Sequence, residues 1–318
     1  MIDITNNTNI EEINSTDLFI CCVGYEERSF CLYDKYNKGI DAKQQLVLTI
    51  NDYELFDSVI QEKIHIIEKN VVNFSVFAYE ADSEVQSEII RKVKEIKKNN
   101  KNVQIDIDYS SMPRSWYCKL PELFSSILTD DDVVNFWYTE GKYIESADVF
   151  STVGIESYRV YSGRSSLNSQ RSRTHIIGVG FDSVRTQGIL SIIDPDNYVI
   201  CNAYDPNRED IHNDVMKANA SVIEQTSITM SLFVNDIELI LAKLKGLINE
   251  LFYASESDVI LVPDGPKPLI FCMSMMPWII GKEGITCLHI LRNSNGAKRI
   301  NVFPGEKVIG FSVKYINN

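Results

Sequence analysis

The same series of landmarks occurs twice along this chain of 318 residues, at a nearly constant distance. Five pairs of positions are each separated by 153 residues: Leu46 and Val199, Asp52 and Asp205, Ser110 and Pro263, Phe136 and His289, and Val149 and Val302. Gly24 and Gly180 are 156 residues apart, which indicates a small local difference in length. A constant offset over separate landmarks predicts an internal duplication. The alternative is that two α/β domains share the rhythm without a common origin.

Apolar runs of strand length alternate with helical stretches in both halves. In the first half the apolar runs lie at 18–24, 45–50, 73–80, 103–109 and 133–140, and the helical stretches at 25–36, 54–69, 83–98 and 115–128. In the second half the apolar runs lie at 175–181, 198–205, 258–265 and 286–292, with a long helical stretch at 232–253. Strands that alternate with helices form right-handed βαβ units around a mostly parallel sheet. The sequence therefore predicts an α/β fold of two tandem Rossmann-like units, related by internal duplication and a pseudo-two-fold axis.

A Ser/Arg-rich stretch without apolar periodicity, SGRSSLNSQRSR at 162–173, lies between the two halves. Its composition is typical of a linker. We therefore predict the first unit at 1–161, the linker at 162–173 and the second unit at 174–318. The strand ends of both units are expected to face a common cleft. The competing arrangement is two independent modules joined by a flexible linker.

Composition restricts the class of partner. Hydrophobic content of 44% with 24% charged residues is typical of a globular chain. The net charge of −13 disfavours a long nucleic-acid duplex as a partner. The basic segment at 91–101 has helical spacing and is expected to be a solvated helix face. No apolar run is long enough to cross a bilayer, and the polar N-terminus does not resemble a signal peptide. Seven cysteines without CxxC or zinc spacing favour reduced, buried thiols in the cytoplasm.

One candidate binding loop follows the first strand of each half, where parallel sheets bind ligands. It comprises Gly24, Tyr25, Glu26, Glu27, Arg28 and Ser29 in the first half, and Gly180, Phe181, Asp182, Ser183, Val184, Arg185 and Thr186 in the second. Glycine permits a tight turn, a hydroxyl caps a helix and arginine binds phosphate in a bidentate manner. GxGxxG and Walker A patterns are absent, so ordinary dinucleotide or P-loop binding is not supported. The alternative role is an Arg–Glu pair that fixes the start of the helix.

A second candidate loop follows the fourth strand. It comprises Asp108, Tyr109, Ser110, Ser111, Met112, Pro113, Arg114 and Ser115 in the first half, and Pro263, Asp264, Gly265, Pro266, Lys267 and Pro268 in the second. Small residues before a helix expose backbone N–H groups to an anion. Arg114 and Lys267 are 153 residues apart, each directly after a proline. A turn needs no base there, whereas a bound phosphate or carboxylate benefits from one; plain turn chemistry is the alternative.

The segment DYSSMPR resembles the fourth-strand signature of CARF domains, in which Asp-x-Thr-Gly-Gly-Thr-Lys precedes a helix. In this resemblance Arg114 and Lys267 stand at the signature lysine, and Gly265 matches a signature glycine. The first half lacks both glycines. CARF domains are Rossmann-like sensors of cyclic oligonucleotides in prokaryotic antiviral systems, and SAVED domains resemble two fused CARF units. The resemblance implies a sensor of a small nucleotide, acting through a separate effector protein or through self-assembly.

Catalysis is the competing function. Glu26, Asp108 and Asp264 are the catalytic candidates, and Glu27 and Asp182 also lie at strand ends, where carboxylates can act as acid–base groups. They could then cleave a phosphodiester or N-glycosidic bond of a nucleotide in the same cleft. The alternative is that these carboxylates hold Arg28, Arg114 or Arg185. Tyr138 and Glu140 could line the cleft or simply pack at a strand end. The four histidines include His212 in an acidic stretch, but no metal site and no cofactor are predicted.

Overall fold

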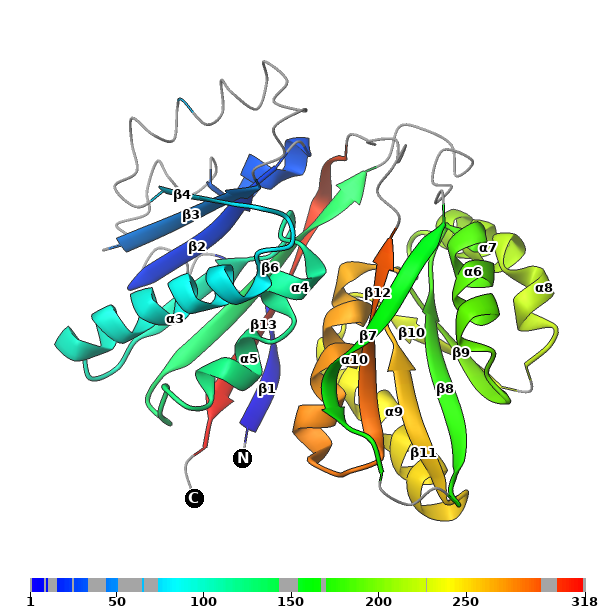
Figure 1. Ribbon diagram of the computed structural model, residues 1–318. Helices are drawn as coiled ribbons and strands as arrows, with labels where there is room; N and C mark the ends of the chain where they lie inside the picture. The colour runs from blue at the N-terminus through cyan, green and yellow to red at the C-terminus, as the bar shows by residue number, and fades with distance from the viewer. Residues whose placement is uncertain are drawn as a thin grey trace. The chain divides into compact units, whose positions relative to one another are not determined.

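The computed structural model describes residues 2–8, 10, 16–24, 26–33, 44–50, 65, 74–142, 154–166, 170–226, 228–292 and 302–316 (Figure 1). The chain divides into two compact units. Unit 1 comprises Met1–Ile144 and Asn301–Asn318, and unit 2 comprises Glu145–Ile300. Each unit is α/β with its own sheet, which confirms the predicted fold class.

Unit 1 contains a seven-stranded sheet in the order β1-β13-β6-β5-β2-β3-β4. The strands from β2 to β6 are mutually parallel, whereas β13 is antiparallel to both β6 and β1. The elements are β1 (Ile2–Asn7), β2 (Leu18–Val23), the 3-10 helix η2 (Glu27–Phe30), β3 (Gln44–Ile50), β4 (Phe74–Phe77), α3 (Asp82–Asn99), β5 (Gln104–Asp108), α4 (Arg114–Tyr117), α5 (Leu120–Phe124), β6 (Val133–Lys142) and β13 (Phe303–Tyr315).

Unit 2 contains a six-stranded sheet in the order β10-β9-β8-β11-β12-β7. Its strands are parallel apart from β7, which is antiparallel to β12. The elements are β7 (Ile155–Arg164), β8 (Ser172–Val179), α6 (Ser183–Ile193), β9 (Asn197–Tyr204), α7 (Glu209–Ala218), α8 (Ala220–Ile223), β10 (Thr229–Phe233), α9 (Ile237–Asn249), the π-helical turn η5 (Glu250–Ala254), β11 (Ser257–Val262), α10 (Lys267–Ile280) and β12 (Ile285–Arg292).

Each sheet includes one strand that directly follows the other unit in the chain, and we call this arrangement the strand exchange. Strand β7 follows unit 1 in the chain but pairs with β12 of unit 2, and β13 follows unit 2 but pairs with β6 of unit 1. The predicted boundaries were therefore wrong: 162–164 belong to β7 and 172–173 to β8, so the expected linker contains the ends of two strands. The stretch lacks apolar periodicity because β7 is an edge strand, and most of its side chains are exposed.

Both sheets follow one order. Apart from the exchanged strand and β1, each reads third, second, first, fourth and fifth strand of its unit, which is the doubly wound arrangement. Many unrelated domains share this order, so the duplication itself stays a prediction.

A buried polar network fixes β13 in the sheet of unit 1. The Ser312 hydroxyl donates to Oδ1 of Asn135 on β6 at 2.6 Å, and Asn7 on β1 donates to both side chains. Asn135 in turn donates to Asp106 on β5 at 3.0 Å. Burial raises the pKa of Asp106, although its hydrogen bonds oppose that shift. Since buried polar groups need matching partners, this network favours one register for β13.

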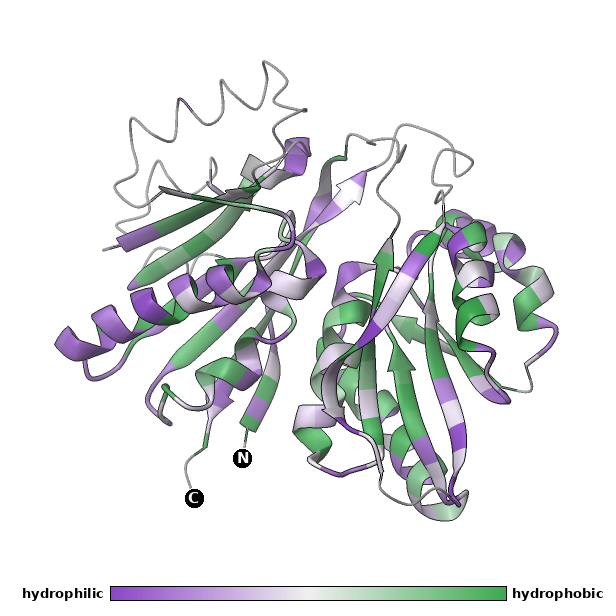
Figure 2. Ribbon diagram, in the orientation of Figure 1, coloured by the Kyte–Doolittle hydropathy of each residue, from purple (hydrophilic) through white to green (hydrophobic). Residues whose placement is uncertain are grey.

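Apolar strands form the cores of both units, and Figure 2 shows the polar outer surface of α3 against them. One cluster in unit 1 joins β2, β3 and β6 through residues that include Phe19, Val47 and Trp137. A cluster in unit 2 joins β8, β9 and β11 to α6, α7 and α8. No helix within the described residues is long and apolar enough to cross a membrane.

The observed bounds of several helices differ from the predicted ones. The helix expected at 83–98 is confirmed as α3. The stretch 115–128 forms the short helices α4 and α5, with a proline in the first turn of α5. The long helix expected at 232–253 starts later, because 232–233 complete β10. The helix expected at 54–69 lies outside the described residues apart from His65, as does the end of the stretch at 25–36.

Candidate functional site

The predicted binding loops follow the two strands between which each sheet reverses its order. These strands are β2 and β5 in unit 1, and β8 and β11 in unit 2 (Figure 1). Such a reversal is where open α/β sheets bind ligands, beyond the carboxyl ends of the strands. The loops are also in contact: in unit 1 the Ser111 hydroxyl lies 3.4 Å from Oε2 of Glu26. The structure thus brings together, within each unit, the two loops that the sequence singled out.

Three glycines let the loops of unit 2 touch through their backbones. A Cβ atom on Gly178 would lie 2.4 Å from the carbonyl oxygen of Asp264, and one on Gly180 would lie 3.0 Å from Cα of Gly265. Gly265 has φ +90°, and a Cβ there would lie 2.5 Å from the carbonyl oxygen of Val179. Gly180 and Gly265 therefore approach each other, rather than leaving their backbones open to a ligand at this point.

A buried ion pair joins the same two loops of unit 2. Nε of Arg185 lies 2.9 Å from Oδ2 of Asp264, and the two side chains are 3% and 6% exposed. Asp182 caps α6, because its Oδ1 accepts from the backbone N–H of Arg185 at 2.9 Å. Buried Thr186 donates to the backbone carbonyl of Asp182. The sequence predicted that these four residues bind the ligand, and in the structure their contacts with one another hold the two loops in place.

In unit 1 the corresponding arginine is also buried in protein contacts. Nε of Arg28 donates to Oε2 of Glu26 at 2.6 Å, and Nη1 donates to the Tyr138 hydroxyl at 2.9 Å and to the Thr139 carbonyl at 3.3 Å. The guanidinium also lies 5.2 Å from the centre of the Tyr138 ring. Ser29 donates to the carbonyl of Gly24. Tyr25 lies outside the described residues. Arg28 therefore ties the first loop to β6.

The carboxylate partner of the arginine differs between the units. Glu26 holds Arg28 from within the first loop, whereas Asp264 holds Arg185 from the second loop. The alternative interpretation, in which carboxylates hold arginines, is confirmed for these two pairs. An isolated buried charge is costly, so each pair keeps its loop charges neutralised.

Asp108 closes the turn after β5. Its Oδ1 accepts from the backbone N–H of Ser110 at 2.9 Å and from the Ser110 hydroxyl at 2.5 Å. The Ser110 hydroxyl accepts in turn from the backbone N–H of Thr139 at 2.7 Å. Burial, and then the charge of Asp108, raise the pKa of Cys21 on the neighbouring strand β2, so this thiol stays protonated. The chain of contacts joins the ends of β5 and β6.

Arg114 and Lys267 are the first residues of α4 and α10, and both are half-buried. A cation at a helix N-terminus opposes the helix dipole, which favours an anion there. The first turn of α10 lies entirely within the residues that the structure describes, and it contains no acidic residue. An anion bound at this helix start would lie close to the charge of Lys267 and to the backbone N–H groups of the first turn.

The sequence missed a cluster of polar and aromatic residues at the ends of β9 and β10. Asn202, buried in β9, contacts Ser231 of β10 and His212 of α7, and Tyr204 packs against His212. The sequence signal was an asparagine inside the apolar run YVICNAY. His212 was considered only as a metal ligand, and no group of three or more metal-ligating side chains occurs in the described part of the chain.

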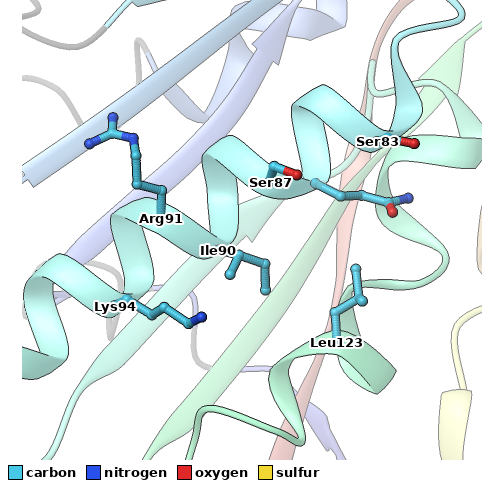
Figure 3. Close-up of a pocket in the computed structure, with 7 residues that line it drawn as sticks. Ser83, Ser87, Ile90, Arg91, Lys94 and Leu123 are labelled. Atoms are coloured by element: carbon cyan, nitrogen blue, oxygen red, sulfur yellow. The ribbon is translucent and has the colours of Figure 1, made fainter.

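A surface groove of about 470 Å³ lies elsewhere, along α3 and α5 of unit 1 (Figure 3). Its lining comprises Ser83, Gln86, Ser87, Ile90, Arg91, Lys94 and Leu123. Arg91 forms ion pairs with Glu88 and Glu95 on the same helix, as expected of a solvated helix face. The groove contains none of the predicted site residues.

No family model and no curated protein matches the chain. Among solved structures, it is similar at 8% identity to a functionally unknown protein of Pseudomonas aeruginosa PAO1, PA1789, with a TM-score of 0.24. The match covers 87% of this chain and 93% of that one.

Proposed function

We propose that the chain binds a small anionic nucleotide, such as a cyclic oligonucleotide, at the carboxyl edge of its parallel sheets, as a sensor in a prokaryotic antiviral system. Lys267 carries the proposal: a half-buried cation at the first residue of a 14-residue helix, next to the strand order reversal of unit 2. A phosphate there would gain both the charge and the backbone N–H groups of the helix start. The resemblance of DYSSMPR and its counterpart to the CARF signature supports the defence role.

We assign two roles to the four basic residues of the loops. Arg28 and Arg185 position the loops, because each is buried against a carboxylate. We assign the phosphate contact to Arg114 in unit 1 and Lys267 in unit 2, because each is the first residue of the helix that follows the second loop. Each charge-assisted contact is expected to contribute roughly 1.5–3 kcal/mol, or about 10-fold to 150-fold in affinity.

A sensor also needs an output. The proposal therefore includes either a separate effector protein or self-assembly of this chain when ligand is bound. Light scattering with and without ligand distinguishes the two, since self-assembly raises the mass and an external effector leaves it unchanged.

The competing proposal is an enzyme that cleaves the nucleotide. Glu26 and Asp264 each hold an arginine, so loss of activity in E26Q or D264N would not by itself identify an acid–base group. Recovery of the ligand is more decisive. Intact ligand after long incubation supports the sensor, and hydrolysis products support the enzyme.

The test is a thermal-shift screen of the purified chain against cyclic nucleotides, linear oligonucleotides, ATP and NAD, followed by analysis of the recovered ligand. We expect at least one phosphate-containing ligand to raise the melting temperature, because binding to the folded state alone stabilises it. A screen in which no nucleotide shifts the melting temperature would contradict the proposal.

A further inference from the structure

A chain of side-chain hydrogen bonds holds the imidazole of His212 in one orientation. The Ser231 hydroxyl donates to Oδ1 of Asn202 at 3.0 Å, and Nδ2 of Asn202 lies 2.9 Å from Nδ1 of His212. An amide nitrogen can only donate, so Nδ1 accepts and the ring proton lies on Nε2. His212 thereby presents Nε2–H as a donor from a fixed, half-buried position.

Two aromatic rings accompany this donor. The Tyr204 ring lies 4.3 Å from the imidazole, centre to centre, at an interplanar angle of 33°. The Phe233 ring packs edge-on against Tyr204 at 5.5 Å and is 39% exposed. Nζ of Lys243 lies 5.9 Å from the Phe233 ring. An exposed aromatic ring next to a fixed hydrogen-bond donor is chemistry that suits a flat heteroaromatic ligand.

This cluster lies on the same sheet edge as the predicted phosphate loops of unit 2. Phe233 is in register with Tyr204, and Asn202 is in register with Val179, one residue before Gly180. Asn219, which follows α7, donates to the Gly180 carbonyl at 2.9 Å, so the helix that carries His212 is tied to the first loop.

The Asn219 side chain gives a second observation. It is 1% exposed, and its Oδ1 has no hydrogen-bond partner in the described part of the chain. Buried polar atoms are nearly always satisfied by protein, water or ligand. A buried acceptor therefore remains beside the loop that starts at Gly180.

We infer that the carboxyl edge of β9 and β10 binds the nucleobase of the ligand, with Tyr204 and Phe233 contacting the ring and Nε2–H of His212 donating to it. The inference rests on the proposed function, because it places the base of the same nucleotide whose phosphate Lys267 would contact. Non-nucleotide anions would then lack this contact.

The test uses the full chain with ¹³C-labelled histidine and observes the imidazole signals by NMR. The chain has four histidines, and loss of one signal in H212Q assigns His212. The probes are adenosine and guanosine, their monophosphates, and ribose 5-phosphate. We expect each nucleoside and nucleotide to shift the His212 signal, whereas ribose 5-phosphate leaves it in place.

Substitutions supply the affinity readout. F233A should weaken nucleoside and nucleotide binding by roughly 10-fold, since base–aromatic stacking is worth about 1–3 kcal/mol. Y253A is the matched control, because Tyr253 is another exposed aromatic residue of unit 2, at 60% exposure. Ribose 5-phosphate should bind F233A and the native protein equally.

The outcomes separate this inference from the proposed function. Nucleotides that bind through Lys267 without shifting His212 would overturn the base subsite and leave the proposed function intact. Nucleosides that shift His212, with nucleotide affinity unchanged in K267A, would support the subsite and contradict the phosphate contact. A chain that binds none of the probes would overturn both.

Discussion

At the scale of residues, two ion pairs with buried arginines, Arg28–Glu26 and Arg185–Asp264, hold the candidate binding loops. Glu26 and Arg28 are two residues apart, so a local pair was an expected alternative. Arg185 and Asp264 lie far apart in the sequence, and only the contact between β8 and β11 brings them together. Asp182 was the nearer candidate, yet it caps α6.

Removal of Arg185 should strongly destabilise the protein. R185M removes one partner of the buried Arg185–Asp264 ion pair, and breaking a buried pair in this way costs about 3–5 kcal/mol. The double variant R185M/D264L should recover a large part of that loss, because it removes both charges. Urea unfolding measures all three proteins, with R208A of the exposed Arg208–Asp210 pair as the control. Equal stabilities of R185M and R208A would contradict the structural role.

Gly265 should not tolerate a side chain. G265A forces an alanine into φ +90° with its Cβ 2.5 Å from a backbone oxygen, so we expect a loss of about 1–3 kcal/mol or more. G246A is the control: a Cβ there meets nothing within 4 Å inside α9, and alanine should stabilise the helix by about 1 kcal/mol. Opposite signs for the two variants in urea unfolding are the expected result.

His175 should make the stability of the protein depend on pH. Burial lowers the pKa of His175 in the folded protein, below its unfolded value of about 6.5. The unfolded chain then binds more protons, so the full contribution is present above pH ~6.5 and is lost as the pH falls. H175Q should flatten the decline in stability below that pH, whereas H65Q, at an exposed site, should not. Parallel pH profiles for native protein and H175Q would rule this out.

At the scale of elements, the sequence predicted every parallel strand of the described residues except β10, the edge strand β4 among them, and it missed β1, β7 and β13, which pair antiparallel. Buried strands such as β2 and β11 appear as apolar runs. Strand β7 has mostly exposed side chains and looks like a linker, and its pairing with β12 cannot be read from local pattern. Strand order between distant segments is set by tertiary contacts, which a single sequence does not reveal.

The exchange of β7 and β13 predicts how the chain responds to a cut. Cleavage at a protease site inserted between 144 and 154 should give two fragments that co-purify, because β13 of the second fragment completes the sheet of the first. Removal of 302–318 from the cut protein should release the first fragment, measured by size-exclusion chromatography.

Two independent modules would behave differently. If the two fragments separate after the cut and each still unfolds cooperatively on its own, the strand exchange is contradicted. Fragments that remain associated to the same degree without 302–318 would contradict it as well.

At the scale of the whole molecule, the alternation of apolar runs and helical stretches was sufficient for the α/β class and for the presence of two sheets. It also located the four candidate loops, because each directly follows a predicted strand, whereas their place beside the strand order reversals depends on tertiary pairing. This alternation did not predict the close contacts of Gly178, Gly180 and Gly265 or the cluster around His212. Both depend on distances between segments that are far apart in the sequence.

The central claim is that an anion binds at the start of α10. Isothermal titration of the best ligand from the screen, with native protein, K267A and K282A, tests it most directly. Lys282 is exposed just after the other end of α10, so its removal changes the net charge equally. We predict that K267A weakens binding by about 10-fold to 150-fold, while K282A stays within about two-fold of the native affinity. Equal affinities of K267A and K282A for that ligand would contradict the claim.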